Sequence, residues 1–115
     1  MSAVQSRQAD KIRELGEALI AIGFRHLDEQ AGVLGLPRST TWSIIRARHK
    51  TSGLSASVIN QMLARPQLPK PVRLKILEYV HEKRAGHYGH KPLQVRRFIA
   101  ALERGACERS DGIRS

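Results

Sequence analysis

The sequence predicts an all-α protein, and three features of its pattern indicate this. Apolar residues recur at spacings of three and four, as on one face of a helix, in several separate segments. No segment alternates between apolar and polar residues with the period of two that a half-buried strand requires. Glycine and proline divide the 115 residues into pieces that suit five or six short helices around one core.

The first part of the chain predicts three helices. The first, at residues 5–23, carries apolar residues on one face at Ile12, Leu15, Leu19 and Ile22. The second begins near Leu27, where two acidic residues suit the positive end of the helix dipole, and Gly35 ends it in a left-handed conformation. Pro37 then presets the first turn of a third helix at residues 38–48, whose first two hydroxyl side chains can satisfy free amides.

Three more helices are predicted in the second part. Ser55 can cap a fourth that continues to about Ala64, before RPQLPKP interrupts the chain. A fifth extends over residues 71–84, and beyond the loop AGHYGHKP a sixth carries the apolar stripe Val95, Phe98, Ile99 and Leu102. The expected organisation is a domain at 1–86, a loop and C-terminal helix at 87–104, and a disordered tail at 105–115.

The charge of the chain favours a polyanionic partner. Its formal net charge is +10, and no Asp or Glu lies between Glu29 and Glu78. The basic residues of that interval are Arg38, Arg46, Arg48, Lys50, Arg65, Lys70, Arg73 and Lys75. A solvated surface normally mixes both signs of charge, so this exclusion of acids favours the docking of a phosphate backbone.

The same composition argues against other classes. A single cysteine, Cys107, forms no internal disulfide, and neither a signal peptide nor an apolar run of roughly 18 residues is present, so we expect a cytoplasmic protein with no membrane partner. No catalytic constellation has a supporting context, so we predict no enzyme, no cofactor and no evident small-molecule ligand. His81, His87 and His90 are interpreted as solvated or phosphate-facing side chains, and no metal site is predicted.

One segment carries a resemblance. In LDEQAGVLGLPRSTTWSIIRA, a small residue, Ala31, precedes Gly35 by four positions at a sharp turn, and Ile44 can lock the following helix into the core. On these residues the segment resembles a DNA-binding helix-turn-helix, and the helices around it resemble the lambda-repressor or Cro-like (XRE-type) domain. Gln30 and Thr41 stand where such motifs usually place apolar residues. LPKPVRLKILEYV is also similar to the helix that follows the motif in LacI-type headpieces.

The resemblance implies a lambda-repressor-like architecture whose third helix enters the major groove of DNA. The side chains expected at base edges or adjacent phosphates are Arg38, Ser39, Thr40, Ser43 and Arg46. Those expected to hold the DNA backbone are Arg48, His49, Lys50, Thr51 and Ser52. Arg38 leads because a guanidinium can reach guanine O6 and N7 together, and its alternative is a solvated turn residue. Trp42 is expected in the core, with contact to a thymine methyl or a sugar as the alternative.

These features predict a sequence-specific regulator of transcription that binds double-stranded DNA, of bacterial or phage type and associated with the nucleoid. A repressor that occupies its operator as a homodimer fits best, and the sixth helix either supplies the dimer contact or packs on the first helix. One alternative is a protein-interaction module such as an antitoxin or antiactivator. Another is a nonspecific nucleic-acid-binding protein, disfavoured because few aromatic side chains are present for stacking.

Overall fold

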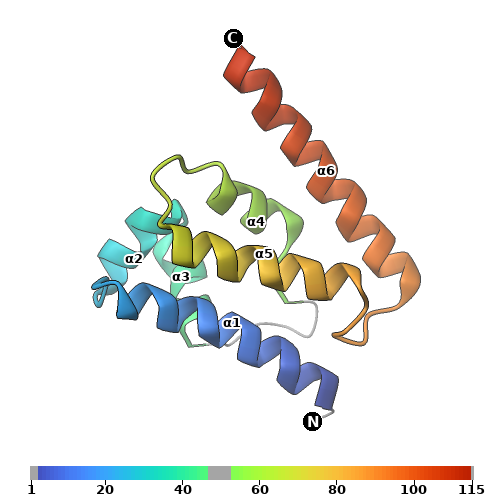
Figure 1. The fold of residues 1–115 in the computed structure, drawn as a ribbon, viewed down its shortest axis with the longest axis horizontal. Coiled ribbons are helices and arrows are strands. Elements are labelled where there is room, and N and C mark those ends of the chain that lie inside the picture. Colours follow the sequence, from blue (N-terminus) through green and yellow to red (C-terminus); the bar gives the residue numbers. More distant parts are fainter. Residues whose placement is uncertain (1–2, 47–52, 115) are drawn as a thin grey trace.

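The computed structural model describes residues 3–46 and 53–114, and the surroundings of side chains within 7–46 and 53–105. Within these ranges the regular structure is entirely helical, which confirms the predicted class. The helices are α1 (Ala3–Ala21), α2 (Leu27–Leu34), α3 (Arg38–Ile45), α4 (Ala56–Leu63), α5 (Lys70–Arg84) and α6 (Pro92–Arg114) (Figure 1).

The two longest helices of the N-terminal part, α1 and α5, lie side by side and run in opposite directions (Figure 1). α3 packs on α1, and α2 packs on α3, so the pair α2 and α3 lies at the C-terminal half of α1. α6 crosses α4 and touches α5. The side chains that these helices bury together include Leu15, Leu19, Leu34, Ile44, Ile59, Met62, Val72, Ile76 and Tyr79.

α1 and α3 approach each other closely at Gly16. A Cβ at this position would lie 3.2 Å from Cδ1 of Ile45 and 3.4 Å from its Cα, which is tighter than most Cβ contacts. Three of the four apolar residues predicted on this face of α1 are buried, but Ile22 is exposed because α1 ends at Ala21. The glycine therefore sets the distance at which α3 rests on the core.

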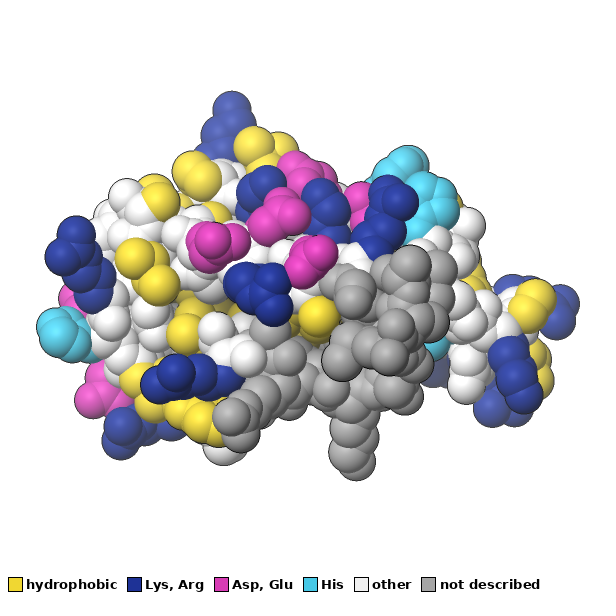
Figure 2. Space-filling model, turned by 90° about the horizontal axis from the view of Figure 1, so that it is seen from below, with side chains coloured by type: hydrophobic (Ala, Val, Ile, Leu, Met, Phe, Trp, Pro, Cys, Tyr) yellow, Lys and Arg dark blue, Asp and Glu magenta, His cyan; other side chains and the backbone are white. Residues whose placement is uncertain are grey.

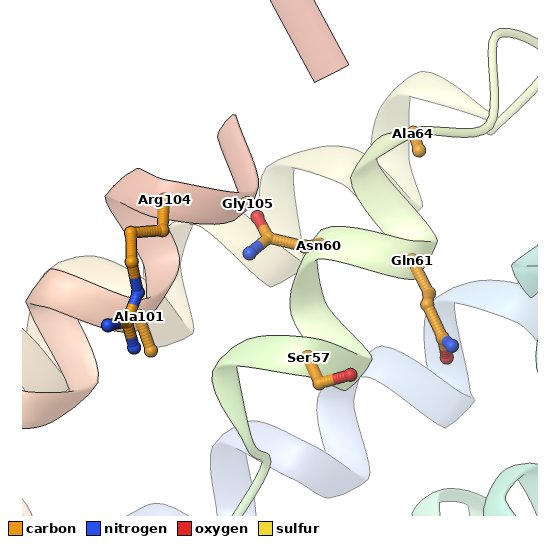
Figure 3. A pocket seen from close by; sticks show the side chains of 7 residues that line it. All are labelled: Ser57, Asn60, Gln61, Ala64, Ala101, Arg104 and Gly105. Carbon is orange, nitrogen blue, oxygen red and sulfur yellow. The ribbon is translucent and has the colours of Figure 1, made fainter. Parts of the chain in front are cut away.

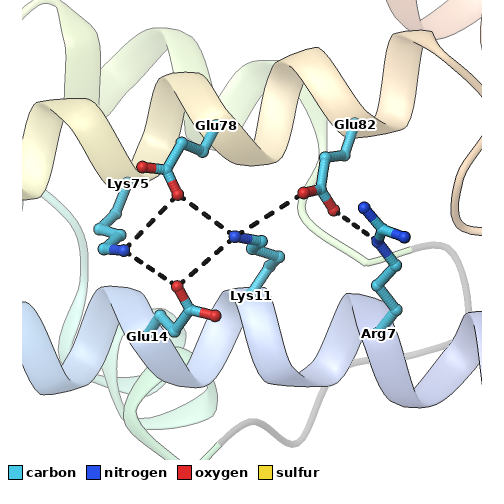
Figure 4. A network of polar contacts seen from close by, with 6 residues as sticks. All are labelled: Arg7, Lys11, Glu14, Lys75, Glu78 and Glu82. Carbon is cyan, nitrogen blue, oxygen red and sulfur yellow. Dashed lines mark hydrogen bonds and ion pairs between the residues drawn. The ribbon is translucent and has the colours of Figure 1, made fainter.

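α1 and α5 are also joined by a network of ion pairs along their shared edge (Figure 4). Lys11 Nζ lies 3.5 Å from Glu14, 3.2 Å from Glu78 and 3.7 Å from Glu82, and Lys75 Nζ lies 3.0 Å from Glu14. At the N-terminal end, the Arg7 guanidinium lies 3.0 Å from Glu82. The network joins residues more than sixty positions apart in the chain. It therefore fixes the register of α5 on α1.

Helix ends follow the sequence in part. Ser55 caps α4, accepting a hydrogen bond from the Val58 N–H at 3.2 Å as predicted. α3 ends at Ile45 with Arg46 as its C-cap, so the predicted length to residue 48 was too long for the described part of the chain. No side chain caps the start of α3, whose N-cap is Pro37, so the predicted hydroxyl caps are not formed.

α6 differs from its prediction at both its packing and its length. Phe98 of its apolar stripe is buried and Val95, Ile99 and Leu102 are half-buried, but the stripe packs on α4 and α5 instead of α1. The helix also continues to Arg114. It therefore includes residues 105–114, which the sequence predicts to belong to a disordered tail. Side chains beyond residue 105 lie outside the described part of the chain.

Gly105 explains why the sequence suggested an end at this point. A Cβ on this residue would overlap the side-chain amide of Asn60, which reaches from α4 toward α6 and donates from Nδ2 to the Leu102 carbonyl at 3.3 Å (Figure 3). The glycine permits two helices to cross closely and does not end one. A groove of about 520 Å³ lies beside this crossing.

In the described ranges, no helix has the length and apolar character needed to cross a membrane.

Candidate nucleic-acid interface

The turn between α2 and α3 has the geometry that the sequence predicts. Gly35 adopts φ 71° and ψ 32°, the left-handed conformation that favours glycine. The N–H groups of Gly35 and Leu36 both donate to the Ala31 carbonyl, at 2.9 and 3.1 Å, which closes the end of α2. A Cβ at Gly35 would also lie 2.6 Å from Cδ of Arg65. The backbone angle therefore favours glycine here, and any larger residue would also have to displace the Arg65 side chain.

The two polar residues that depart from the helix-turn-helix pattern are buried where the pattern has apolar ones. Gln30 donates from Nε2 to the Phe24 carbonyl at 2.8 Å, and Thr41 donates from Oγ1 to the Pro37 carbonyl at 3.0 Å. Ile44 completes this inner face and is fully buried. Because both polar side chains have hydrogen-bond partners, they occupy the core without a large penalty.

The outer face of α3 presents the side chains that the resemblance implies. Arg38, Ser39 and Arg46 are exposed, and Thr40 and Ser43 are half-buried. The Ser43 hydroxyl donates to the Ser39 carbonyl at 3.1 Å, so it is directed back along the helix. Four of the five residues predicted at the bases lie on α3 and the fifth, Arg46, is its C-cap, and α3 has no acidic residue in its first turn.

Trp42 corrects a prediction. Its side chain is 41% exposed, so the expectation of a core tryptophan is wrong. Thr41 takes the inward position instead, and Ile44 follows it by three residues on the same buried face. Trp42 precedes Arg46 by four residues and follows Arg38 by four, so the three residues lie along the same outer face.

Arg38 is held by an acidic residue that the sequence reasoning assigned only to the helix dipole. Its Nε lies 3.0 Å from Oδ1 of Asp28, across the turn, in a pair whose side chains are 69% and 76% exposed. An exposed pair of this kind contributes about 0–1 kcal/mol. The pair therefore orients the guanidinium, and exchange of Asp28 for another acceptor costs little.

The residues predicted to hold the DNA backbone, namely Arg48, His49, Lys50, Thr51 and Ser52, lie outside the described residues. The point at which the chain leaves that segment is well defined. Gly53 adopts φ 72°, and a Cβ there would overlap the Gln8 amide oxygen and the Tyr79 hydroxyl. Gly53 is therefore pressed against the side chains of α1 and α5.

A buried hydrogen-bond chain anchors the same point. Tyr79 donates from its hydroxyl to Oε1 of Gln8 at 2.9 Å and accepts from the Leu54 N–H at 2.9 Å, while Lys83 Nζ donates to the Leu54 carbonyl at 3.1 Å. Burial raises the pKa of Tyr79 and lowers that of Lys83 to about 8. Sequence reasoning missed this chain, because Gln8 and Lys83 read as surface residues in amphipathic helices.

Several basic residues of the acid-free interval have structural partners. Arg65 donates from Nη2 to the Gly32 carbonyl at 3.1 Å, and Arg73 donates from Nη2 to the Arg65 carbonyl at 3.1 Å. Both guanidinium groups thus satisfy carbonyls at helix ends, and Lys75 pairs with Glu14. The absence of acids between Glu29 and Glu78 is therefore partly a property of the fold, and only part of it is free to indicate a polyanion.

The charged side chains are distributed unevenly over the surface. Figure 2 shows acidic side chains gathered among Lys and Arg on one area of the face that α1 contributes to.

Within the described residues, no group of three or more His, Cys, Asp and Glu side chains could hold a metal ion. Compared with protein-family models, with curated proteins and with solved structures, the chain has no match.

Proposed function

We propose that the chain is a sequence-specific regulator of transcription that binds double-stranded DNA with α3 in the major groove. The proposal extends to a bacterial or phage repressor that occupies its operator as a homodimer on the nucleoid. One observation carries it: α2, the left-handed Gly35 and α3 form a closed pair whose inner face is buried, while its outer face carries exposed Arg38 and Arg46.

The chemistry of this outer face suits base edges. Arg38 can exchange the exposed Asp28 carboxylate for O6 and N7 of guanine, because both are paired acceptors that match a guanidinium. The Trp42 ring offers apolar surface for a thymine methyl group. The first-turn amides of α3, which no side chain caps, suit a phosphate at the positive end of the helix dipole.

The dimer part of the proposal rests on the two-fold symmetry of operators that helix-turn-helix proteins bind. The sixth-helix stripe contributes little to it, because Phe98 is buried and Ile99 and Leu102 pack against the core of the same chain. The dimer contact is therefore better sought elsewhere on the surface.

A protein-interaction module is a second candidate function, and one observation favours it. Leu74 and Leu77 of α5 are 50% and 45% exposed, and they lie three residues apart on the side of α5 away from its buried face. Two adjacent exposed leucines can take part in a protein contact. The same leucines could also serve the homodimer of the first proposal, in which case they would contact a second copy of this chain.

The test is selection of bound fragments from a random duplex library with the full chain at near-physiological salt. Enrichment of an inverted repeat is expected, and it would give the half-site spacing directly. Binding without an enriched sequence would replace the regulator with a nonspecific nucleic-acid-binding protein. No binding would replace it with the protein-interaction module, to be tested by the solution mass of the chain and of its Leu77→Lys variant.

A further inference from the structure

A cavity of about 580 Å³ lies on the side of the molecule formed by the start of α4, the end of α5 and the first turns of α6. None of the residues that line it belongs to α2 or α3, so it is separate from the proposed base-reading face.

The lining is cationic. It includes Lys83, Lys91 and Arg97, and none of the described lining residues is Asp or Glu. Three consecutive segments contribute these cations: the end of α5, the loop after it and the start of α6. α6 also begins at this cavity with no acidic residue in its first turn, so the positive end of its dipole adds to the same field. An anion would therefore be attracted to this cavity.

The same cavity has an apolar wall. Leu54 and Phe98 are buried core residues that line it, and Ala56 and Ala101 extend the wall on α4 and α6. Lys83 Nζ lies 4.4 Å from the centre of the Phe98 ring, so a cation and an aromatic face meet at one place. Cavities that bind small molecules commonly have about 300–1,000 Å³ and combine a largely apolar lining with a few polar groups.

We propose that this cavity binds a small organic anion, with its acidic group toward Lys83, Lys91 and Arg97 and a compact apolar body against Leu54 and Phe98. A DNA phosphate fits the cavity less well, because a phosphodiester has no apolar body to cover that wall. The site is distinct from the proposed DNA surface, but Gly53 and Leu54 join it to the segment that follows the predicted phosphate contacts.

The test is a titration of the ¹⁵N-labelled full chain with three probes, followed by amide chemical shifts. Benzoate carries a charge and a ring, acetate carries the charge alone, and benzamide carries the ring alone. Benzoate is expected to give saturable shifts at residues 53–56, 88–91 and 97–101. Acetate and benzamide should bind at least about tenfold more weakly, because each lacks one of the two interactions.

Two arginines on α6 provide a matched pair of variants. Arg97 lines the cavity and Arg96 does not, yet both are exposed on the same helix turn. Arg97→Gln should weaken benzoate binding by about tenfold, whereas Arg96→Gln should leave it unchanged, although both remove one positive charge. Equal losses in the two variants would mean nonspecific attraction and would overturn the proposal.

Three other results would also overturn the proposal: no saturable shift with benzoate, equal shifts with benzamide, or shifts at these amides with a DNA duplex but with none of the small probes. The last result would assign the cavity to the nucleic-acid surface. The titrations with the three small probes contain no DNA, so a failure to bind benzoate leaves the proposed DNA-binding function standing.

Discussion

Two regions of the molecule use the same charged residue types in opposite ways. Along the edge between α1 and α5, Arg7, Lys11 and Lys75 each lie within 4 Å of a glutamate from the facing helix. On the outer face of α3, Arg38 meets only an exposed aspartate, and among the described residues no acid pairs with Arg46. The difference lies in the surrounding acids and not in the number of cations.

The charged residues of a sequence therefore indicate a partner only after each has been assigned to a surface and its internal ion pairs have been identified. At the shared edge of α1 and α5 the charges are matched internally, since the glutamates of one helix face the cations of the other (Figure 4). The surplus of positive charge is left for other surfaces, and α3 is one of them. If α3 were as self-contained as the edge between α1 and α5, the proposed function would lose its basis.

The largest expected effect separates the two faces of α3 itself. Ile44→Ala removes a fully buried side chain and should lower the free energy of unfolding by about 2–5 kcal/mol. Trp42→Ala removes a side chain that is 41% exposed and should cost about 1 kcal/mol or less, because this side chain lies outside the buried core. Urea unfolding followed by circular dichroism measures both. Similar losses in the two variants would show that the outer face is structural.

The next effect contrasts two exposed arginine–aspartate pairs. Arg38 pairs with Asp28 at 3.0 Å on the proposed DNA face, and Arg13 pairs with Asp10 at 2.8 Å on α1. Arg38→Ala should cost about 1–3 kcal/mol of discrimination at one base position of the operator. Arg13→Ala removes the same charge and should leave the base preference unchanged. Fluorescence anisotropy with the selected operator and single-base variants of it measures this, and equal effects would count against base reading by α3.

The sequence was informative where a local rule decides the outcome. Gly35 has the left-handed backbone that favours glycine, and Ser55 caps α4 with its hydroxyl. The apolar residues spaced along α1 are buried from Ile12 to Leu19. Each of these features depends on residues within a few positions of one another, so the pattern in the chain contains the cause.

Features that depend on distant partners were not predictable. Gly105 allows α6 to cross α4 closely, and Gly16 allows α1 to approach α3 closely. The local sequence pattern suggested a helix end at Gly105 and gave no signal at Gly16. Trp42 was placed in the core by its residue type, although Thr41 could fill that position by bonding to its own helix. The anchor of Leu54 by Lys83 joins residues 29 positions apart, and no spacing rule links them.

Two lysines of α5 carry the comparison into pH dependence. The hydrogen bond to Glu14 raises the pKa of Lys75, whereas burial lowers the pKa of Lys83 to about 8. A lysine whose folded pKa lies below its unfolded value of 10.5 makes the folded state bind fewer protons between these values, so stability rises with pH there.

The expected rise between pH 8 and pH 10 is at most about 1.4 kcal/mol per pH unit for this one proton. Chemical denaturation at several pH values measures it. Lys83→Met should flatten the profile, and Lys75→Met should keep the rise, because a raised pKa contributes stability below 10.5 and loses it only above. A profile unchanged by Lys83→Met would show that the buried lysine does not titrate in this window.

The smallest expected effect concerns the acids of the edge between α1 and α5. The hydrogen bond from Lys75 lowers the pKa of Glu14, and that from Arg7 lowers the pKa of Glu82. A carboxyl group whose folded pKa is lowered contributes stability above its ordinary value of 4.5 and loses it as the pH falls through the folded value. Because solvent screens these partly exposed pairs, the loss should be about 1 kcal/mol or less for each carboxylate.

Melting temperatures from pH 7 down to pH 3 should fall less steeply in Glu82→Gln than in the parent chain. Glu17→Gln is the matched control, since Glu17 is exposed on α1 and forms no ion pair within the described residues, and it should keep the parent slope. Identical slopes in all three proteins would mean that the network orients α5 without stabilising it, and the contrast with α3 would then be one of geometry alone.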